Sequence, residues 1–107
     1  MSVLAASPLP DTSLCISDLR SRSRDSALAE IVARLGEAVR DPLLLREALI
    51  RREKFASTDL GRGVALPNAR SLAISGVRCV LARSLKGLSW EDEKLPVHLV
   101  CAVVSPA

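Results

Sequence analysis

The stretch Ser57–Arg70, STDLGRGVALPNAR, divides the sequence into two halves whose apolar residues follow different periods. Between residues 24 and 54, before it, apolar residues recur at helical spacing; after it, they alternate with polar residues. Within it, Gly61 and Gly63 bracket one arginine, and Pro67 ends a short apolar run. Glycine favours tight turns and proline interrupts central strands. The stretch therefore predicts a loop, a short strand and a break that exposes the next side chain, Asn68.

Two helices are predicted before this stretch. Apolar residues at helical spacing after residue 24 predict the first helix, with Ser23 as its N-cap. The segment DPLLLREALIRREKF predicts the second, with Asp41 as N-cap, Pro42 at the first helical position and an end near Lys54. Its expected buried stripe consists of four apolar residues: Leu44, Leu45, Ala48 and Leu49.

Four strands are predicted from alternation, at residues 13–19, 63–67, 77–83 and 96–104. A polar connection, LKGLSWEDEK, is expected between the last two. The order strand, helix, helix, strand, strand, strand predicts an α/β fold in which helices flank a mixed β-sheet. Since no helix follows the last strand, we expect the second face of this sheet to lack its cover.

Length and hydropathy predict one domain over residues 13–107, preceded by a flexible leader at residues 1–12. The hydrophobic share is 49% and the mean hydropathy is +0.25, although only 2% of the residues are aromatic. Such a chain is expected to expose apolar surface that another molecule covers, for example in a homo-oligomer. No apolar run reaches the length of a membrane span and no secretory signal is evident, which favours the cytoplasm without membrane insertion.

Charge and cysteine usage point to no cofactor and no metal. The net charge is +3, but base-stacking aromatics are lacking and acidic residues are interleaved with the basic ones, so a nucleic-acid-associated module is only a remote alternative. No two cysteines have the spacing of a zinc or redox site, and each lies in a β-like run. We therefore expect three small buried hydrophobes: Cys15, Cys79 and Cys101.

The centre of the sequence resembles the enzyme IIA domain, fructose/mannitol type, of the bacterial phosphotransferase system, including its nitrogen-regulatory relative. The resemblance rests on an Arg-Glu pair, a Ser-Thr pair, a glycine-bracketed turn, a small apolar strand, and then a proline followed by the acceptor position. The matching residues are Arg52-Glu53, Ser57-Thr58, Gly61, Gly63, Val64-Ala65-Leu66, Pro67-Asn68 and Arg70. It extends from about Ser13, and it implies that the family's domain continues beyond the point where this chain ends.

The resemblance implies a phosphocarrier of sugar transport or nitrogen regulation. In the family, a histidine receives a phosphoryl group from the carrier HPr and passes it to a IIB domain. Asn68 stands at that position, and Arg52 is expected beside the phosphoryl group. The further binding residues it implies are Ser57, Thr58, Gly61, Gly63 and Arg70. The implied partners are HPr-like and IIB-like proteins or a regulatory protein target.

Asparagine at position 68 argues against the family's chemistry. The nitrogen lone pair of an amide is delocalised into the carbonyl, so it cannot attack a phosphoryl group as an imidazole does. The sequence therefore predicts a non-phosphorylatable regulatory or binding relative. The alternative is an active phosphotransferase domain that uses a histidine outside this chain. His98, the only histidine, lies in a strand and is expected to be structural or surface-exposed.

Overall fold

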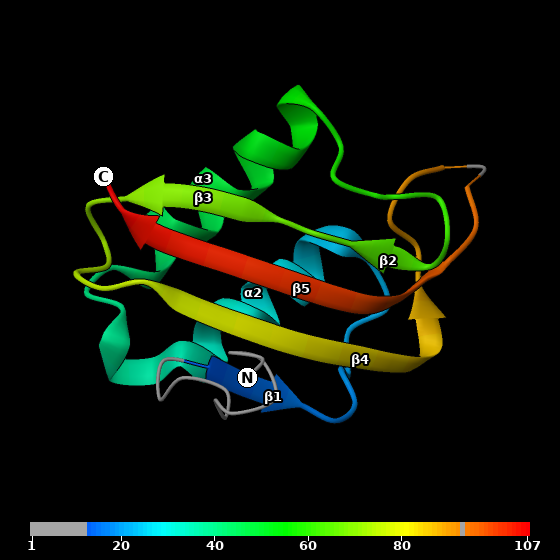
Figure 1. Cartoon of the computed structure of the whole chain (residues 1–107), viewed down its shortest axis with the longest axis horizontal. Coiled ribbons are helices and arrows are strands. Elements are labelled where there is room, and N and C mark those ends of the chain that lie inside the picture. Colours follow the sequence, from blue (N-terminus) through cyan, green and yellow to red (C-terminus); the bar gives the residue numbers. More distant parts are fainter. Residues whose placement is uncertain (1–12, 93) are drawn as a thin grey trace, which may run out of the picture.

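A five-stranded mixed sheet forms the centre of the computed structural model, which describes residues 13–92 and 94–107 (Figure 1). The leader predicted at residues 1–12 lies outside the described residues. The strands, in chain order, are β1 (Ser13–Ile16), β2 (Val64–Ala65), β3 (Asn68–Ser71), β4 (Arg78–Leu88) and β5 (Val97–Pro106). The spatial order is β1-β4-β5-β2, and β3 also pairs with β5.

The central strands β4 and β5 are antiparallel, whereas β1 is parallel to β4 and both β2 and β3 are parallel to β5. This arrangement confirms the predicted mixed sheet. Parallel neighbours need long connections, and the chain between β1 and its parallel neighbour β4 supplies one that contains both helices.

Helices α2 (Arg24–Leu35) and α3 (Pro42–Phe55) begin where the sequence predicts. The backbone N–H of Leu44 donates to Asp41 Oδ1 at 3.1 Å, which satisfies one of the free donors in the first turn of α3. Between the helices a 3₁₀ turn spans Gly36–Ala38. No helix in the described part of the chain is long and apolar enough to cross a membrane.

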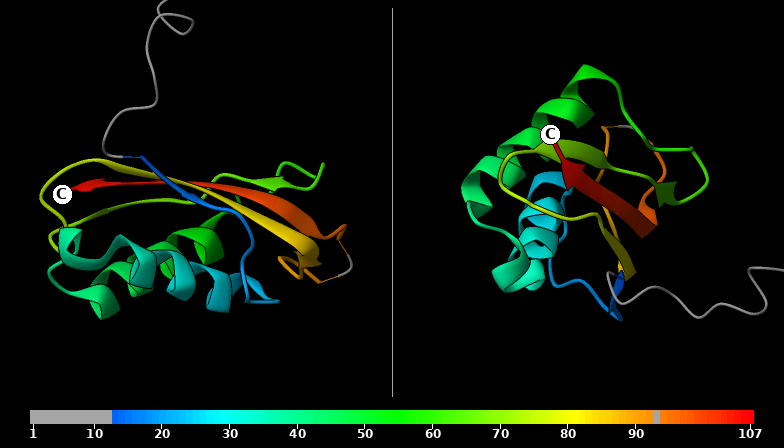
Figure 2. Two further views of the ribbon diagram at one scale, coloured as in Figure 1. Left: turned by 90° about the horizontal axis from the view of Figure 1, so that it is seen from below. Right: turned by 60° about the vertical axis from the view of Figure 1, so that its left-hand side comes forward.

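Both helices pack against the same face of the sheet, as the edge-on view in Figure 2 shows. The buried side chains of α3 are Leu45, Leu49 and Glu53. The prediction that Leu44 is buried is wrong, since its side chain is 43% exposed in the first turn, beyond the edge of the contact. The core thus lies between one layer of helices and one face of the sheet.

The opposite face carries apolar side chains that no described residue of another layer covers. Residues paired across neighbouring strands project to the same face of a sheet, so the register of β1, β4 and β5 defines this set. We call it the open face: Cys15, Cys79, Leu81, Leu99, Cys101 and Val103. The prediction of buried cysteines is wrong, because Cys15 is exposed and the other two are only half-buried.

Two sheet elements differ from the sequence-based expectation. β3 was not predicted, since the chain after Pro67 is polar and its strand conformation depends on pairing with β5. β4 continues to Leu88, through residues expected to form a connection. Its register with β5 shifts between Arg83 and Leu88, where Gly87 has a φ of 91° that side chains rarely adopt.

The contact between α3 and the sheet should dominate stability. Leu49 is fully buried, so Leu49→Ala is expected to lower the free energy of unfolding by about 2–5 kcal/mol through lost burial and a cavity. Leu60→Ala is the matched control, because Leu60 is 59% exposed and its truncation should change stability by about 0.5 kcal/mol or less. Urea unfolding followed by circular dichroism measures both, and equal effects would contradict this packing.

Candidate functional site

A pocket of about 530 Å³ opens at the edge of the sheet, between the second half of α3 and the start of β3. Its lining combines apolar, amide and guanidinium groups from these two elements: Ala48, Arg51, Arg52, Phe55, Asn68, Ala69 and Arg70. The loop and β2 connect the two elements in the chain, and the parallel pairing of β3 with β5 holds β3 at the edge of the sheet beside α3.

Asn68 is the first residue of β3, directly after Pro67. It pairs with Val103, and Arg70 pairs with Ser105, so their side chains project to the open-face side, while Ala69 between them points to the core and is buried. The Asn68 Nδ2 donates to the carbonyl oxygen of Leu66 at 3.3 Å. This bond uses one amide hydrogen and leaves the other, together with the amide oxygen, free for a ligand.

Three arginines give the pocket its charge. Arg52 Nη1 donates to the carbonyl oxygen of Ala56 at 2.7 Å, which holds this guanidinium at the C-terminal end of α3. In residues 13–92 and 94–107 the one ion pair joins Arg24 to Asp25, so no described carboxylate neutralises Arg51, Arg52 or Arg70. Uncompensated guanidinium groups around a concave site attract anions, above all those with several acceptor oxygens.

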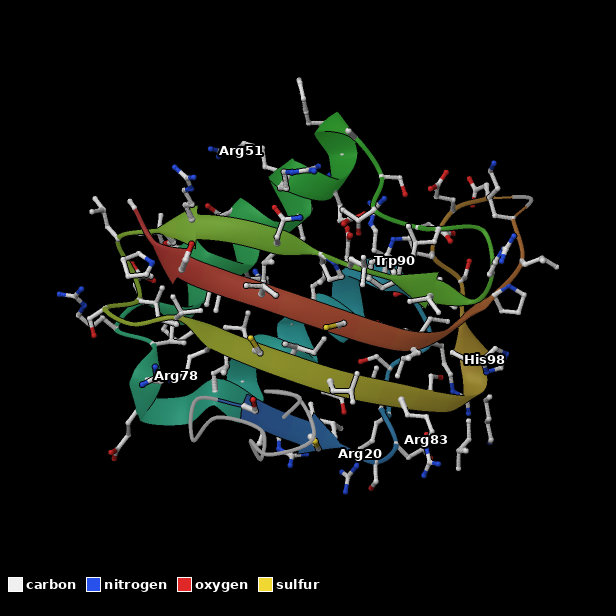
Figure 3. The ribbon with its side chains drawn as sticks, viewed as in Figure 1. Arg20, Arg51, Arg78, Arg83, Trp90 and His98 are labelled. Atoms are coloured by element: carbon white, nitrogen blue, oxygen red, sulfur yellow. The ribbon has the colours of Figure 1, made fainter. Side chains whose placement is uncertain are left out.

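Sequence reasoning missed four lining residues: the small Ala48 and Ala69, and the larger Arg51 and Phe55. Phe55 is 87% exposed at the last position of α3, and Arg51 projects from the same helix beyond the edge of the sheet (Figure 3). A fully exposed aromatic side chain beside a charged pocket is typical of contact surfaces. The available signal was the helical spacing of these residues, which puts both on the side of α3 that turns away from the core.

Next to Arg52 in α3, Glu53 is buried at 3% exposure and is held by hydrogen bonds alone. Its Oε2 accepts from the backbone N–H of Thr58 and from Trp90 Nε1, each at 3.1 Å, and its Oε1 accepts from the hydroxyl of Thr58. The carboxylate therefore ties the end of α3 to the following loop and to the segment after β4. Trp90 is thereby anchored on this helix.

The other four predicted binding residues shape the loop and do not line the pocket: Ser57, Thr58, Gly61 and Gly63. Ser57 Oγ accepts from the backbone N–H of Asp59 at 3.1 Å. Gly61 and Gly63 have φ values of 78° and 83°, which explains the requirement for glycine. The Gly63 carbonyl accepts from the backbone N–H of His98 at 2.8 Å, so this turn is fixed to the start of β5.

His98 lies away from the pocket. Its Nδ1 donates to the carbonyl oxygen of Ser84 at 2.8 Å, and its side chain sits at the opposite end of β5 from the chain terminus (Figure 3). It is five positions from Val103, the residue that pairs with Asn68. No cluster of metal-ligating side chains occurs in the part of the chain that the structure describes.

Comparison with known proteins identifies the family. Residues 10–107 match the family described as "Phosphoenolpyruvate-dependent sugar phosphotransferase system, EIIA 2". Because this match covers most of the chain, the protein belongs to that family, and the resemblance seen in the sequence is confirmed.

Three curated relatives are similar in sequence. The PTS system fructose-specific EIIABC component of Bacillus subtilis is 28% identical over 91 residues, which cover 82% of this chain and 14% of that protein. The nitrogen regulatory protein of Bradyrhizobium diazoefficiens is 29% identical, covering 82% and 59% respectively. The PTS system fructose-specific EIIA component of Haloferax volcanii is 35% identical, covering 57% and 40%. The chain spans less than two thirds of the length of each.

Solved structures share the fold. The nitrogen regulatory protein IIA-Ntr from Neisseria meningitidis superposes with a TM-score of 0.75 at 24% identity, covering 91% of this chain and 67% of that one. IIA mannitol from Escherichia coli gives a TM-score of 0.69 at 20% identity, covering 94% and 73%. These similarities confirm the predicted α/β class.

Removing the acceptor oxygens of Glu53 should lower the stability of the contact between α3 and the following loop. We expect Glu53→Met to lower the free energy of unfolding by about 2–5 kcal/mol, because the two N–H donors on Oε2, from Thr58 and Trp90, lose their partner at about 1–3 kcal/mol each and the Thr58 hydroxyl loses its acceptor as well. Urea unfolding followed by the fluorescence of Trp90, the only tryptophan, measures this loss.

Two controls accompany this variant. Glu53→Gln keeps one oxygen that can accept from both donors, so its effect should be smaller. Glu47→Met makes the same chemical change at an exposed position of the same helix and should be nearly neutral. If Glu53→Met proves as stable as Glu47→Met, the carboxylate does not hold the loop.

Proposed function

We propose that this chain is a IIA-type domain that binds phosphotransferase partners, or a regulatory protein target, without accepting a phosphoryl group. The observation that carries the proposal is an asparagine, Asn68, in a pocket with three arginines that have no described carboxylate partner. The pocket has the charge for a phosphoryl group and lacks a nucleophile to receive it.

The chemistry of each group supports binding of a phosphoryl group without its transfer to this chain. Phosphoryl transfer depends mostly on positioning and charge stabilisation, and planar guanidinium groups suit the phosphoryl oxygens. The arginines that would do this are Arg52 and Arg70, with Arg51 at the rim. The Asn68 amide can donate a hydrogen bond to such an oxygen, but it cannot form a phosphoramidate by displacement. A phosphoryl group that enters the pocket would thus remain on the partner that brought it.

Membership of this family suggests two classes of partner protein. One solved relative, the mannitol IIA protein of Escherichia coli, is described in complex with phosphorylated enzyme IIB of the mannitol system, and it superposes on this chain with a TM-score of 0.68 at 19% identity. By analogy we propose IIB-like and HPr-like proteins as partners of the pocket. The similarity to a nitrogen regulatory protein supports a regulatory target as the other class. Both classes would place the protein in the cytoplasm.

A second candidate function is active phosphotransfer through a histidine that is not in this chain. The similarity to sugar-specific EIIA proteins favours it, because those names describe transport components. His98 does not serve this role, since it lies outside the pocket with Nδ1 engaged by Ser84.

A phosphorylation assay distinguishes the two functions. Incubation with enzyme I, HPr and radiolabelled phosphoenolpyruvate should leave this chain unlabelled. Asn68→His should give an acid-labile label, because it restores an imidazole next to the arginines. In that background Arg52→Gln should slow labelling by about tenfold or more, since a charge-assisted contact is lost. Acid-labile label on the unaltered chain would contradict the proposed function.

The matched control in the same background is Arg46→Gln, on α3 but outside the pocket, which should not change the labelling rate. A pull-down of phosphorylated HPr or IIB by the unaltered chain, weakened by Arg52→Gln but not by Arg46→Gln, tests binding without transfer. Absence of binding to every phosphotransferase protein and of any label would also refute the role proposed for the pocket.

A further inference from the structure

The net charge of the chain is concentrated around the pocket of Asn68. The sequence contains 15 basic and 12 acidic residues, which gives +3. Helix α3 and strand β3 contain five of the basic residues: Arg46, Arg51, Arg52, Lys54 and Arg70. They contain only two of the acidic ones, Glu47 and the buried Glu53, so the rest of the chain has ten residues of each sign. An excess of one sign beside a concave surface raises the local concentration of the opposite ion.

The arginines of the pocket come from two elements. Arg51 and Arg52 lie on α3 and Arg70 lies on β3, so guanidinium groups of both elements line the same space. Arg52 Nη1 donates to the carbonyl oxygen of Ala56, which leaves its other N–H groups for a ligand. A guanidinium forms paired hydrogen bonds with two oxygens of one anion. Three of them suit a phosphate, whose charge is spread over several oxygens, better than a carboxylate with two.

Asn68 makes binding to this pocket reversible. Its Nδ2 uses one hydrogen on the carbonyl oxygen of Leu66, at 3.3 Å, and the second hydrogen can be donated to a ligand oxygen. The amide has no basic nitrogen that could attack phosphorus, so a phosphate that enters keeps all its bonds and leaves unchanged. The pocket is therefore an equilibrium binding site, at which no group is transferred to this chain.

The size and the apolar part of the lining call for a ligand larger than a phosphate ion. The volume of about 530 Å³ lies within the range of roughly 300–1,000 Å³ that is usual for small-molecule sites. Two alanines, Ala48 and Ala69, and the ring of Phe55 line the part that the arginines do not. An aromatic ring packs well against a flat or cyclic organic group. A phosphate that carries such a group would use both parts of the lining.

We propose that this pocket reversibly binds a small organic phosphate monoester, with the phosphate at its three arginines and the organic group against Phe55. The inference rests on the proposed function, because it takes the same pocket to receive phosphoryl oxygens without accepting the group. It adds a small-molecule ligand, which competes with a phosphorylated partner protein for the same guanidinium groups.

Titration of the isotope-labelled full chain with phenyl phosphate, followed by the chemical shifts of its backbone amides, tests the proposal. In about 0.15 M NaCl we expect saturable shifts at residues 68–70 with a dissociation constant below about 1 mM. Methyl phosphate and inorganic phosphate lack the ring, so they should bind about threefold to tenfold more weakly. Benzoate keeps the ring but has one charge and two oxygens, so it should bind more weakly than phenyl phosphate.

Three variants assign the contacts. Arg70→Gln should raise the dissociation constant of phenyl phosphate about tenfold or more, because a charge-assisted hydrogen bond is lost. Asn68→Asp should do the same, since it keeps the size of the side chain and places a negative charge beside the phosphate. Phe55→Ala should weaken phenyl phosphate about threefold to tenfold and leave methyl phosphate unchanged.

Arg46→Gln is the matched control. It removes the same charge from α3 as Arg70→Gln removes from β3, but Arg46 does not line the pocket. Exposed charges that do not contact the ligand are screened by salt, so the dissociation constant should change by less than about twofold. Circular dichroism verifies that each variant is folded.

Three results would overturn the proposal. The first is the absence of saturation up to about 10 mM phenyl phosphate, tenfold above the expected limit. The second is an equal loss of binding in Arg46→Gln and Arg70→Gln, which would mean that the net charge alone attracts the anion. The third is equal affinity for inorganic phosphate and phenyl phosphate, which would mean that the organic group has no site.

The outcome is separable from that of the proposed function. A pull-down of phosphorylated HPr or IIB together with no saturable binding of phenyl phosphate refutes the small-molecule ligand alone. Acid-labile label on the unaltered chain refutes the proposed function, whatever the titration shows.

Discussion

The buried carboxylate of Glu53 is the interaction on which the arrangement around the pocket depends. It lies at the C-terminal end of α3 and accepts hydrogen bonds from Thr58 and Trp90, so three separate segments of the chain converge on one side chain. A buried charge is costly unless donors surround it, and here they come from the loop and from the segment after β4. The position of α3 relative to the loop that leads to Asn68 follows from this contact.

Phosphotransfer normally requires positive charge around the phosphoryl group and a nucleophile that receives it. The pocket has the charge, and Asn68 is not such a nucleophile. Arg51, Arg52 and Arg70 provide positive charge with no described carboxylate to neutralise it. Asn68 provides hydrogen bonds in place of a nucleophile. An amide and an imidazole are similar in size and polarity, so in the function proposed above asparagine at this position preserves the shape of a docking surface without the covalent step. Under the proposed function, recognition of a partner and chemistry on it are independent properties of this site.

Much of the fold could be predicted from the sequence, because local signals coincide with the tertiary structure. The N-caps at Ser23 and Asp41 and the strands at either end follow from capping preferences and alternation. The predictions that were missing or wrong have two physical causes. β3 is polar and exists through its pairing with β5, and the glycine-containing bend of β4 resembles a connection when only its residues are considered. Leu44 and the cysteines were misplaced because apolar character does not show which face another layer covers.

The sequence by itself determined the family, the order of helices and strands apart from β3, the glycine turn, and the absence of a nucleophile at position 68, since these depend on residue identity and near-neighbour backbone preferences. Only the tertiary structure decided that Arg51 and Phe55 join Asn68 in one pocket, that Ser57 and Thr58 support the loop instead, and that the three cysteines lie on the open face. Those outcomes depend on strand pairing and helix packing, which bring together residues that are distant in the chain. Local sequence patterns do not show which residues that are separated in the chain lie close together in space.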